Sequence, residues 1–183
     1  NAGVTYVFER VGASWVQTAK LTASDAEEYE YFGYSVAVDG PTAVVGAFFA
    51  DAGDVDEAGA AYVFERSAGG WTQSAKLTAP EPEQWDDFAC SVGISAARVI
   101  VGARFDHDAD GAWLGSVHVF ARAPAGWTYA ATLTASDGVA DDQFGYAVAI
   151  SCGRAVVGAP LRTMPAGAAY VFNLDCSFHG DLN

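Results

Sequence analysis

The chain repeats itself at an interval of 56 residues, and this period constrains the fold more than any other feature of the sequence. Three kinds of residue mark the period: Trp15, Trp71 and Trp127, then Phe32, Phe88 and Phe144, then Gly3, Gly59 and Gly115. A fixed period of about 50 residues is typical of propellers and solenoids, in which one unit packs against copies of itself. The repeat therefore indicates an architecture, and it says much less about biochemical activity.

Each period contains four short segments that read as β-strands. In the second full copy they span residues 88–94, 98–103, 115–120 and 127–133. The segments are rich in β-branched and aromatic residues and are bounded by Gly, Asp, Ser or Pro, and no window has a convincing helical apolar period. The sequence predicts an all-β fold of four-stranded antiparallel blades, which is a β-propeller. The coils of a β-helix are much shorter than this period, so a β-helix is a poor alternative.

The first segment of each blade alternates bulky and small side chains. Phe32, Tyr34, Val36 and Val38 alternate with glycine, serine and alanine, and the copy that begins at Phe144 repeats the pattern. Because side chains point to alternate faces of a strand, one face of this strand is nearly bare. We expect the bare face to let a neighbouring blade approach closely near the propeller axis.

The segments add up to thirteen strands, or about three and a quarter blades. The blade repeats are residues 1–23 (partial), 32–79, 88–135 and 144–172 (partial). Since propellers close with about four to eight blades, we expect part of a larger, seven-bladed propeller, or an arc whose open edges meet a partner or a second copy. We assign residues 1–174 to this domain and residues 175–183 to a polar tail that could begin an appended module.

Several short motifs of the repeat resemble a known family, the FG-GAP repeat of integrin α-subunit propellers and of many bacterial secreted proteins. The matching elements are Phe-Gly at 32–33 and 144–145, Gly-Ala-Pro at 158–160, and Gly-Ala-Ala-Tyr-Val-Phe at 59–64 and 167–172. Residues 88–89 depart from Phe-Gly, and residues 46–47 and 102–103 lack the proline of Gly-Ala-Pro. The resemblance covers residues 1 to about 173 and implies an extracellular or cell-surface propeller with a role in adhesion or binding.

The family's calcium site is not carried over by this resemblance. Many members bind Ca²⁺ through an Asp-x-Asp-x-Asp-Gly loop between the first and second strands of a blade. Here the three corresponding turns are short and contain at most one carboxylate, that of Asp39.

The acidic residues are numerous and unevenly distributed. The formal charge of −14 disfavours nucleic acid, whose phosphates would be repelled, and favours cationic partners. Eighteen of the 23 acidic residues fall in loops that join second to third strands or lead from one blade to the next. Both kinds of loop emerge on the same side of an antiparallel blade, so we expect an acidic binding face. No stretch approaches 18 consecutive apolar residues, so no membrane span is predicted.

Six carboxylates in the loops between blades are candidate binding residues: Glu28, Glu30, Asp86, Asp87, Asp141 and Asp142. Residues 30, 86 and 142 are acidic in every copy. A carboxylate that recurs in this way has an alternative role, because it can cap a turn by accepting bonds from backbone amides. The loops between second and third strands differ among copies, and variable loops on a rigid scaffold often carry specificity.

Two acidic loops are candidate calcium sites. The first contains Asp106, Asp108 and Asp110 followed by Gly111, and such alternation can direct several hard oxygens at Ca²⁺. The later carboxylate ligands of a calcium loop are missing, so an unoccupied acidic loop is the alternative. A less complete version of the pattern contains Asp51, Asp54 and Asp56.

The sequence favours a protein that is not an enzyme. No Ser, Cys or Thr has the flanking motif of a nucleophile, and no single carboxylate pair stands out as a glycosidase dyad. His118 occupies the position of Tyr62 and Tyr170 in other copies, so we interpret it as a packing residue. Cys90 replaces Tyr34 and should be a buried, inert thiol.

Cys152 and Cys176 form a candidate disulfide. They follow the first and third strands of the last blade, which are about 9.6 Å apart, whereas a disulfide joins Cα atoms within about 7 Å. The chain has left its strand by Cys176 and can bend inward. Such a bridge would suit an oxidising, extracellular setting.

Two classes of function remain open. The first is a secreted or cell-surface binding or adhesion scaffold, whose acidic loops meet a protein, a glycan or a cation such as Ca²⁺. The second is a structural spacer, or an accessory domain of a larger extracellular enzyme. The concentration of carboxylates on one side favours the first class.

Overall fold

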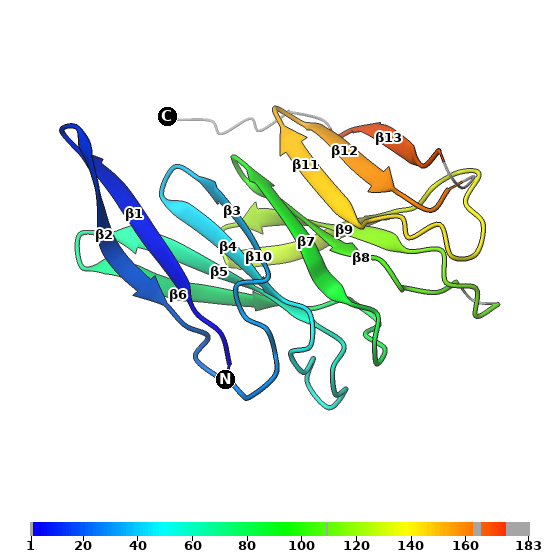
Figure 1. Cartoon of the computed structure of the whole chain (residues 1–183), viewed down its shortest axis with the longest axis horizontal. Coiled ribbons are helices and arrows are strands. Elements are labelled where there is room, and N and C mark those ends of the chain that lie inside the picture. The colour runs from blue at the N-terminus through cyan, green and yellow to red at the C-terminus, as the bar shows by residue number, and fades with distance from the viewer. Residues whose placement is uncertain (1, 109, 163–165, 175–183) are drawn as a thin grey trace.

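A computed structural model describes residues 2–108, 110–162 and 166–174. These residues form thirteen strands in four antiparallel sheets (Figure 1). The first sheet has β1 (Thr5–Val11) and β2 (Ser14–Leu21). The second has β3 (Ser35–Asp39), β4 (Thr42–Ala47), β5 (Ala60–Ser67) and β6 (Gly70–Leu77). The third has β7 (Phe88–Ser95), β8 (Arg98–Ala103), β9 (Ser116–Ala123) and β10 (Gly126–Leu133). The fourth has β11 (Ala147–Ser151), β12 (Arg154–Ala159) and β13 (Ala168–Asn173).

The predicted all-β propeller of four-stranded blades is confirmed as a partial propeller whose sheets do not close into a ring. Strands that follow one another in the sequence pair side by side within each sheet. The described residues contain no helix, and so none that is long and apolar enough to cross a membrane. The inner strand β7 contacts both β3 and β11, so the last three sheets lie next to one another with their inner strands in contact.

The hydrophobic core is divided into three clusters, each of which lies between two neighbouring sheets. Leu21 of the first sheet packs with Val45 of the second, and Val44 of the second packs with Val101 of the third. The last cluster joins the third sheet to the fourth. Each sheet thus buries its faces against adjacent copies, as a repeat architecture requires.

The repeating glycine and phenylalanine form one contact between sheets. Gly59 has a φ of +98°, and a Cβ there would overlap the backbone carbonyl of Phe88. The close approach lets the N–H of Phe88 donate to Ala58 O at 3.2 Å and buries the phenylalanine ring completely. The same contact recurs for Gly3 with Phe32 and for Gly115 with Phe144. A side chain in place of this glycine would displace the backbone of the next sheet.

The small side chains of the inner strands allow the close approach expected from the sequence. The hydroxyl of Ser35 donates to Ala89 O at 2.8 Å in the next sheet, and that of Ser91 donates to Gly145 O at 2.7 Å. A Cβ on Gly102 would meet the same carbonyl of Gly145. Glycine and serine at these positions therefore set the spacing of the sheets.

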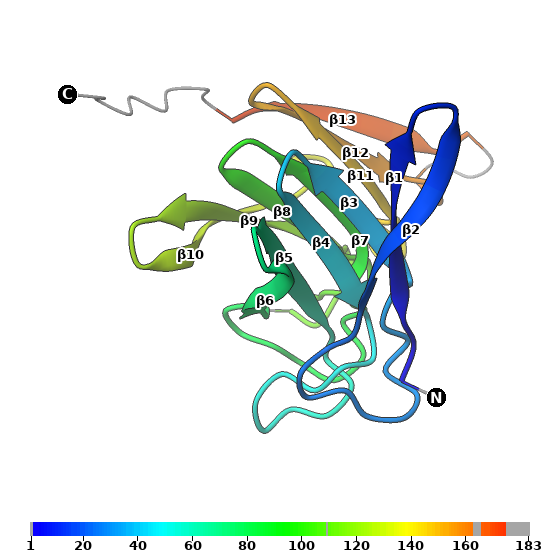
Figure 2. The same cartoon turned by 90° about the vertical axis from the view of Figure 1, so that its left-hand side faces the viewer.

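The inner strand of the second sheet is uncovered on its bulky face. Val36 and Val38 are 58% and 67% exposed, whereas their equivalents Val92 and Ile94 in the third sheet are 8% and 7% exposed. The difference arises because the first sheet consists of β1 and β2 alone, so no inner strand among the described residues precedes β3 and covers this face, whereas β7 is packed against β3 (Figure 2). An apolar hollow of about 350 Å³ lies there between β1 and the β3–β4 pair.

Candidate functional site

The long loops gather on one side of the sheets. Figure 1 shows the loops that join β2 to β3, β4 to β5 and β6 to β7 at the lower side, away from the tips of the β3–β4 and β7–β8 hairpins. The hairpin turns contain two residues each, for example Gly40-Pro41 and Ala96-Ala97. This arrangement follows from antiparallel pairing, in which alternate connections emerge at opposite ends of the strands.

Three of these loops surround an acidic hollow of about 330 Å³. Its lining residues are Glu27, Glu28, Tyr29, Glu30, Phe49, Asp51, Asp56, Glu57 and Gln84. Glu57 connects the loops, because its Oε2 accepts bonds from Trp85 Nε1 at 2.7 Å and from Gln84 Nε2 at 3.3 Å. The hollow is open to solvent and combines several carboxylates with two aromatic rings.

Exposed aromatic side chains accompany the carboxylates on these loops. Tyr29 is 71% exposed, Trp85 60%, Trp113 55% and Tyr31 50%. Tyr29 and Trp85 are 56 residues apart and have φ values of 73° and 71°, a left-handed conformation that is uncommon for bulky residues. These four residues were not predicted as candidates from the sequence, although aromatic residues inside acidic loops are a signal that points to them.

Three of the six candidate binding carboxylates are buried and cap their own loops. Glu30, Asp86 and Asp142 each accept a bond of 2.8 Å from the backbone N–H three residues earlier. Asp87 is also buried, and its Oδ2 lies 2.6 Å from Nη2 of Arg104. Glu28 and Asp141 are exposed. The capping geometry matches the structural alternative for the recurring position.

Burial raises the pKa of the carboxyl groups of Glu30, Asp86 and Asp87. Loss of solvent raises the pKa of Asp86 to about 6, although the backbone bond from Glu83 acts in the opposite direction. Burial also raises the pKa of Glu30, and it raises that of Asp87 in spite of the nearby Arg104. Burial acts to raise the pKa of Asp106 as well, but bonds from His118 and Ser116 hold it below its usual range.

The two candidate calcium loops do not bring their carboxylates together. Oδ1 of Asp108 accepts bonds from the backbone N–H groups of Asp110 and Ala112, each at 3.0 Å. Oδ2 of Asp106 points elsewhere and lies 3.5 Å from His118 Nε2. Among the described residues, the one group of three potential ligands whose atoms lie close together is Asp86, Asp106 and His107.

The second acidic loop also uses its carboxylates locally. Oδ1 of Asp51 accepts a bond of 3.0 Å from the backbone N–H of Glu57. Asp51 and Asp56 line the acidic hollow, and Asp54 is exposed. Asp51 and Asp56 therefore add negative charge to the lining of the hollow.

The remaining candidates lie away from this hollow. His118 is buried against Phe88, with 5.4 Å between ring centroids, and contacts the hydroxyls of Ser116 and Thr132. Cys90 is buried, and burial raises its pKa to about 11. Cys152 is exposed at the β11–β12 turn, while Cys176 and its proposed disulfide lie outside the described residues.

Comparisons with known proteins agree with the repeats seen in the fold. A family model of the FG-GAP repeat matches residues 15–64, 71–120 and 127–172. A solved structure titled "Structure of YjhT" is 18% identical, with a TM-score of 0.41 over 68% of this chain, and the chain spans 32% of that structure. A search of curated proteins gives no match.

Proposed function

Because the chain belongs to the FG-GAP repeat family, we propose that it is a non-catalytic binding domain whose acidic, aromatic-bearing loops hold a basic segment of a partner protein. FG-GAP repeats are typical of extracellular proteins, and we propose that this domain acts outside the cell, in attachment to a surface or a partner.

The single observation that carries this proposal is the acidic hollow between the three loops. An arginine or lysine side chain that enters it would meet the carboxylates of Glu27 and Asp56, and charge-assisted bonds of this type are stronger than neutral ones. The rings of Tyr29 and Phe49 offer faces on which a guanidinium group can stack. The surrounding negative charge would also speed the encounter with a basic partner.

The exposed aromatic residues extend this surface beyond the hollow. Tyrosine and tryptophan are enriched at the energetic centres of protein interfaces, where they contribute large apolar area with little loss of side-chain freedom. Tyr29 lines the hollow itself, and Trp85 is anchored to it by Glu57. A partner segment that places its basic side chain in the hollow would therefore cover both rings.

A second candidate function is a structural spacer. Its support is a recurring ion pair that joins neighbouring sheets. Arg66 pairs with Glu9 of the preceding sheet, and Arg122 pairs with Glu65, each at 2.8 Å. A spacer, or an accessory domain of a larger enzyme, would need only these bonds and a soluble surface.

Binding of labelled oligo-arginine and oligo-lysine peptides, measured by fluorescence anisotropy at several salt concentrations, tests the binding role. We expect saturable binding that weakens with salt, because exposed charges are screened. Replacing two carboxylates of the hollow, Glu27→Gln with Asp56→Asn, should weaken binding by about tenfold or more.

The matched control is Glu9→Gln with Glu65→Gln, which changes the net charge equally but on β1 and β5. This control should retain the affinity of the original chain. If both double variants lose the same amount of peptide affinity, the loss reflects overall charge, and this result would contradict a binding site at the hollow. Binding to a glycan array but to no basic peptide would replace the protein ligand with a glycan, and absence of all binding would favour the spacer.

A further inference from the structure

The same buried carboxylate recurs in the last three sheets, but its surroundings differ. Glu30, Asp86 and Asp142 accept the same backbone bond from the residue three positions earlier. Their own carbonyl groups also accept equivalent bonds, from the N–H groups of Phe49, Phe105 and Leu161. The three loops are thus copies of one structure, and residues at matching positions can be compared directly.

Two of the three carboxylates have a basic side chain of this chain nearby. In the fourth sheet, Nη1 of Arg162 lies 3.3 Å from Oδ2 of Asp142. In the second sheet, Lys76 lies near Glu30 and acts to lower its pKa. A buried carboxylate is costly without such a compensating charge.

The third sheet lacks both of these basic residues. Asp106 occupies the place of Arg162, as the matching bonds of their N–H groups to Ala103 O and Ala159 O show. Thr132 stands 56 residues after Lys76. Asp86 is only 2% exposed, and its Oδ1 has no hydrogen-bond partner. The internal cation has therefore been replaced by a second carboxylate, which makes the local charge more negative.

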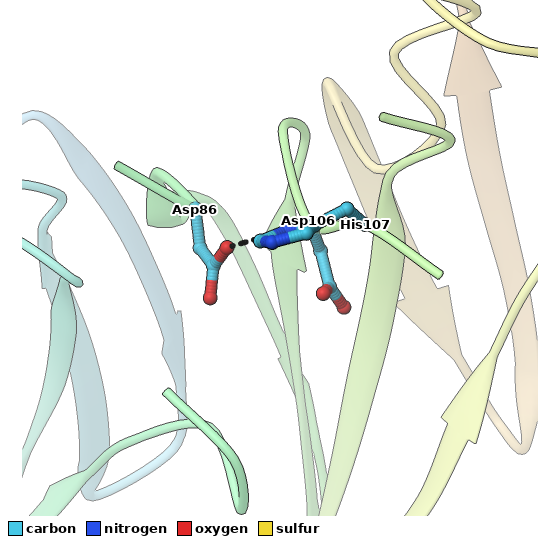
Figure 3. Close-up of side chains that lie close together, drawn as sticks. All are labelled: Asp86, Asp106 and His107. Atoms are coloured by element: carbon cyan, nitrogen blue, oxygen red, sulfur yellow. Dashed lines mark ion pairs between the residues drawn. The ribbon is translucent and has the colours of Figure 1, made fainter. Parts of the chain in front are cut away.

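His107 points its ring at this unpartnered oxygen. Nδ1 of His107 lies 3.5 Å from Oδ1 of Asp86, too far for a good hydrogen bond, and Nδ1 has no hydrogen-bond partner (Figure 3). On the other side of the ring, Nε2 lies 2.8 Å from Oε2 of Glu83. A carboxylate at one ring nitrogen holds the proton there and leaves the other nitrogen free to bind a metal, as is common in protein metal sites.

We propose that Asp86, Asp106 and His107 bind a divalent d-block cation of the Zn²⁺ type, which supplies the positive charge that Arg162 supplies in the fourth sheet. The potential ligand atoms of the three residues all lie within 4.8 Å of one another. Zn²⁺ binds imidazole nitrogen and carboxylate oxygen at about 2.0–2.2 Å, so small side-chain movements bring all three into range.

One imidazole and two carboxylates favour this class of cation over Ca²⁺. Calcium takes about 6–8 oxygen ligands, and a single buried loop pair with a nitrogen donor does not offer them. Three protein ligands leave a position for water or for a donor from a partner. The site differs from the acidic hollow in its residues, so either proposal can fail without the other.

Isothermal titration of the chain with ZnCl₂, together with the visible absorption of the Co²⁺ complex, tests the site. We expect one saturable site and the intense bands of a low-coordinate Co²⁺ centre, without the charge-transfer absorption that a thiolate would add. The exposed thiol of Cys152 is removed in the reference chain by Cys152→Ser. Glu83→Gln should weaken zinc binding by about 10- to 100-fold, and His107→Gln should weaken it further.

Two variants separate a metal site from a merely structural cluster. Asp106→Arg recreates the arrangement of the fourth sheet, so it should abolish zinc binding while the chain stays folded without metal. Asp142→Asn removes the matching carboxylate in the fourth sheet and should leave zinc binding unchanged. A Co²⁺ spectrum like that of the aqueous ion, or zinc binding that survives His107→Gln and Asp106→Arg, would overturn the proposal.

Discussion

The hydroxyl of Ser91 donates a 2.7 Å hydrogen bond to the backbone carbonyl of Gly145, which leads into the next sheet. Gly102 lies beside the same carbonyl, so close that a Cβ would overlap it. Ser35 makes the equivalent bond one repeat earlier, to Ala89. The distance between neighbouring sheets therefore depends on a hydroxyl and on a missing side chain, and this relationship leads to the first prediction.

Gly102→Ala should destabilise the fold by about 1–3 kcal/mol, because the new methyl group forces two sheets apart in a packed interior. Gly158→Ala is the matched control, since a Cβ there meets only Ala147, at 3.7 Å, an ordinary contact. Urea denaturation of both variants measures the difference. A similar loss of unfolding free energy in the two variants would contradict the proposed role of Gly102.

Ser91→Ala should lower the unfolding free energy by about 1 kcal/mol, because the buried carbonyl of Gly145 loses its strongest donor. The effect should be absent in an Ala147→Ser control, where no following sheet offers an acceptor among the described residues. The same urea denaturation applies, and full stability in Ser91→Ala would show that the bond contributes nothing.

Trp85→Ala and Trp113→Ala should change the unfolding free energy by no more than about 0.5 kcal/mol, since both rings are exposed. Trp85→Ala should nevertheless weaken binding of the basic peptides, because Trp85 is bonded to Glu57 at the acidic hollow. Trp113 lies on the β8–β9 loop and serves as the comparison. Peptide affinity that survives Trp85→Ala would remove this ring from the binding surface.

The thiol of Cys90 should react far more slowly than that of Cys152. Burial raises the pKa of Cys90 to about 11, above its ordinary value of 9.0, so little thiolate is present near neutral pH. Alkylation at about pH 8 followed by mass spectrometry of the peptides measures both rates. Equal reactivity in the native chain would mean that Cys90 is accessible.

The same shift has a consequence for stability at high pH. The folded chain keeps the proton of Cys90 over a range in which the unfolded chain loses it, so stability should fall as pH rises from 9.0 toward about 11. In Cys90→Ala this part of the pH dependence should disappear. An unchanged alkaline stability profile in that variant would contradict the buried state of the thiol.

Residues 1–183 should self-associate through the uncovered face of β3. Val36 and Val38 are exposed beside an apolar hollow, and exposed apolar patches of this kind favour association. Val36→Thr with Val38→Thr should shift the sedimentation profile toward the monomer and reduce binding of a hydrophobic dye. If the original chain is monomeric and binds no dye, the exposed face of β3 does not drive association.

Some features of the fold were predictable because they repeat. The 56-residue period, the thirteen strands and the short turns, such as the one at Gly40-Pro41, follow from local patterns that recur in each copy. The bare face of the inner strand was also predicted, because side chains at alternate positions of a strand always point to opposite faces of the sheet. The contact of Gly59 with Phe88 explains why these two residues recur, but its partners are 29 residues apart and lie in different sheets.

Sites proved harder to predict than strands. Asp106, Asp108 and Asp110 form a regular pattern in the sequence, yet Asp108 caps its own loop, and Asp106 lies near His118 and near the cluster of Asp86 and His107. The ring of His107 lies between the carboxylates of Asp86, on the side of Nδ1, and Glu83, on the side of Nε2, and both of these residues belong to the neighbouring β6–β7 loop. Sequence position does not tell which oxygen of a flexible loop points where, because that depends on the neighbouring loop.

The sequence by itself determined the repeating unit. Hydrophobic alternation and turn residues specify strands and turns over a few neighbouring positions, and the same pattern occurs in each copy. Only the tertiary structure decided which charged groups are buried, which of them are paired and which of them have an oxygen without a hydrogen-bond partner. Those outcomes depend on contacts between separate loops and strands of the same sheet, where Arg162, Lys76 or Asp106 stands beside the equivalent carboxylate. A buried charge must be balanced by whatever lies next to it in space, and the distance along the chain carries no information about that neighbour.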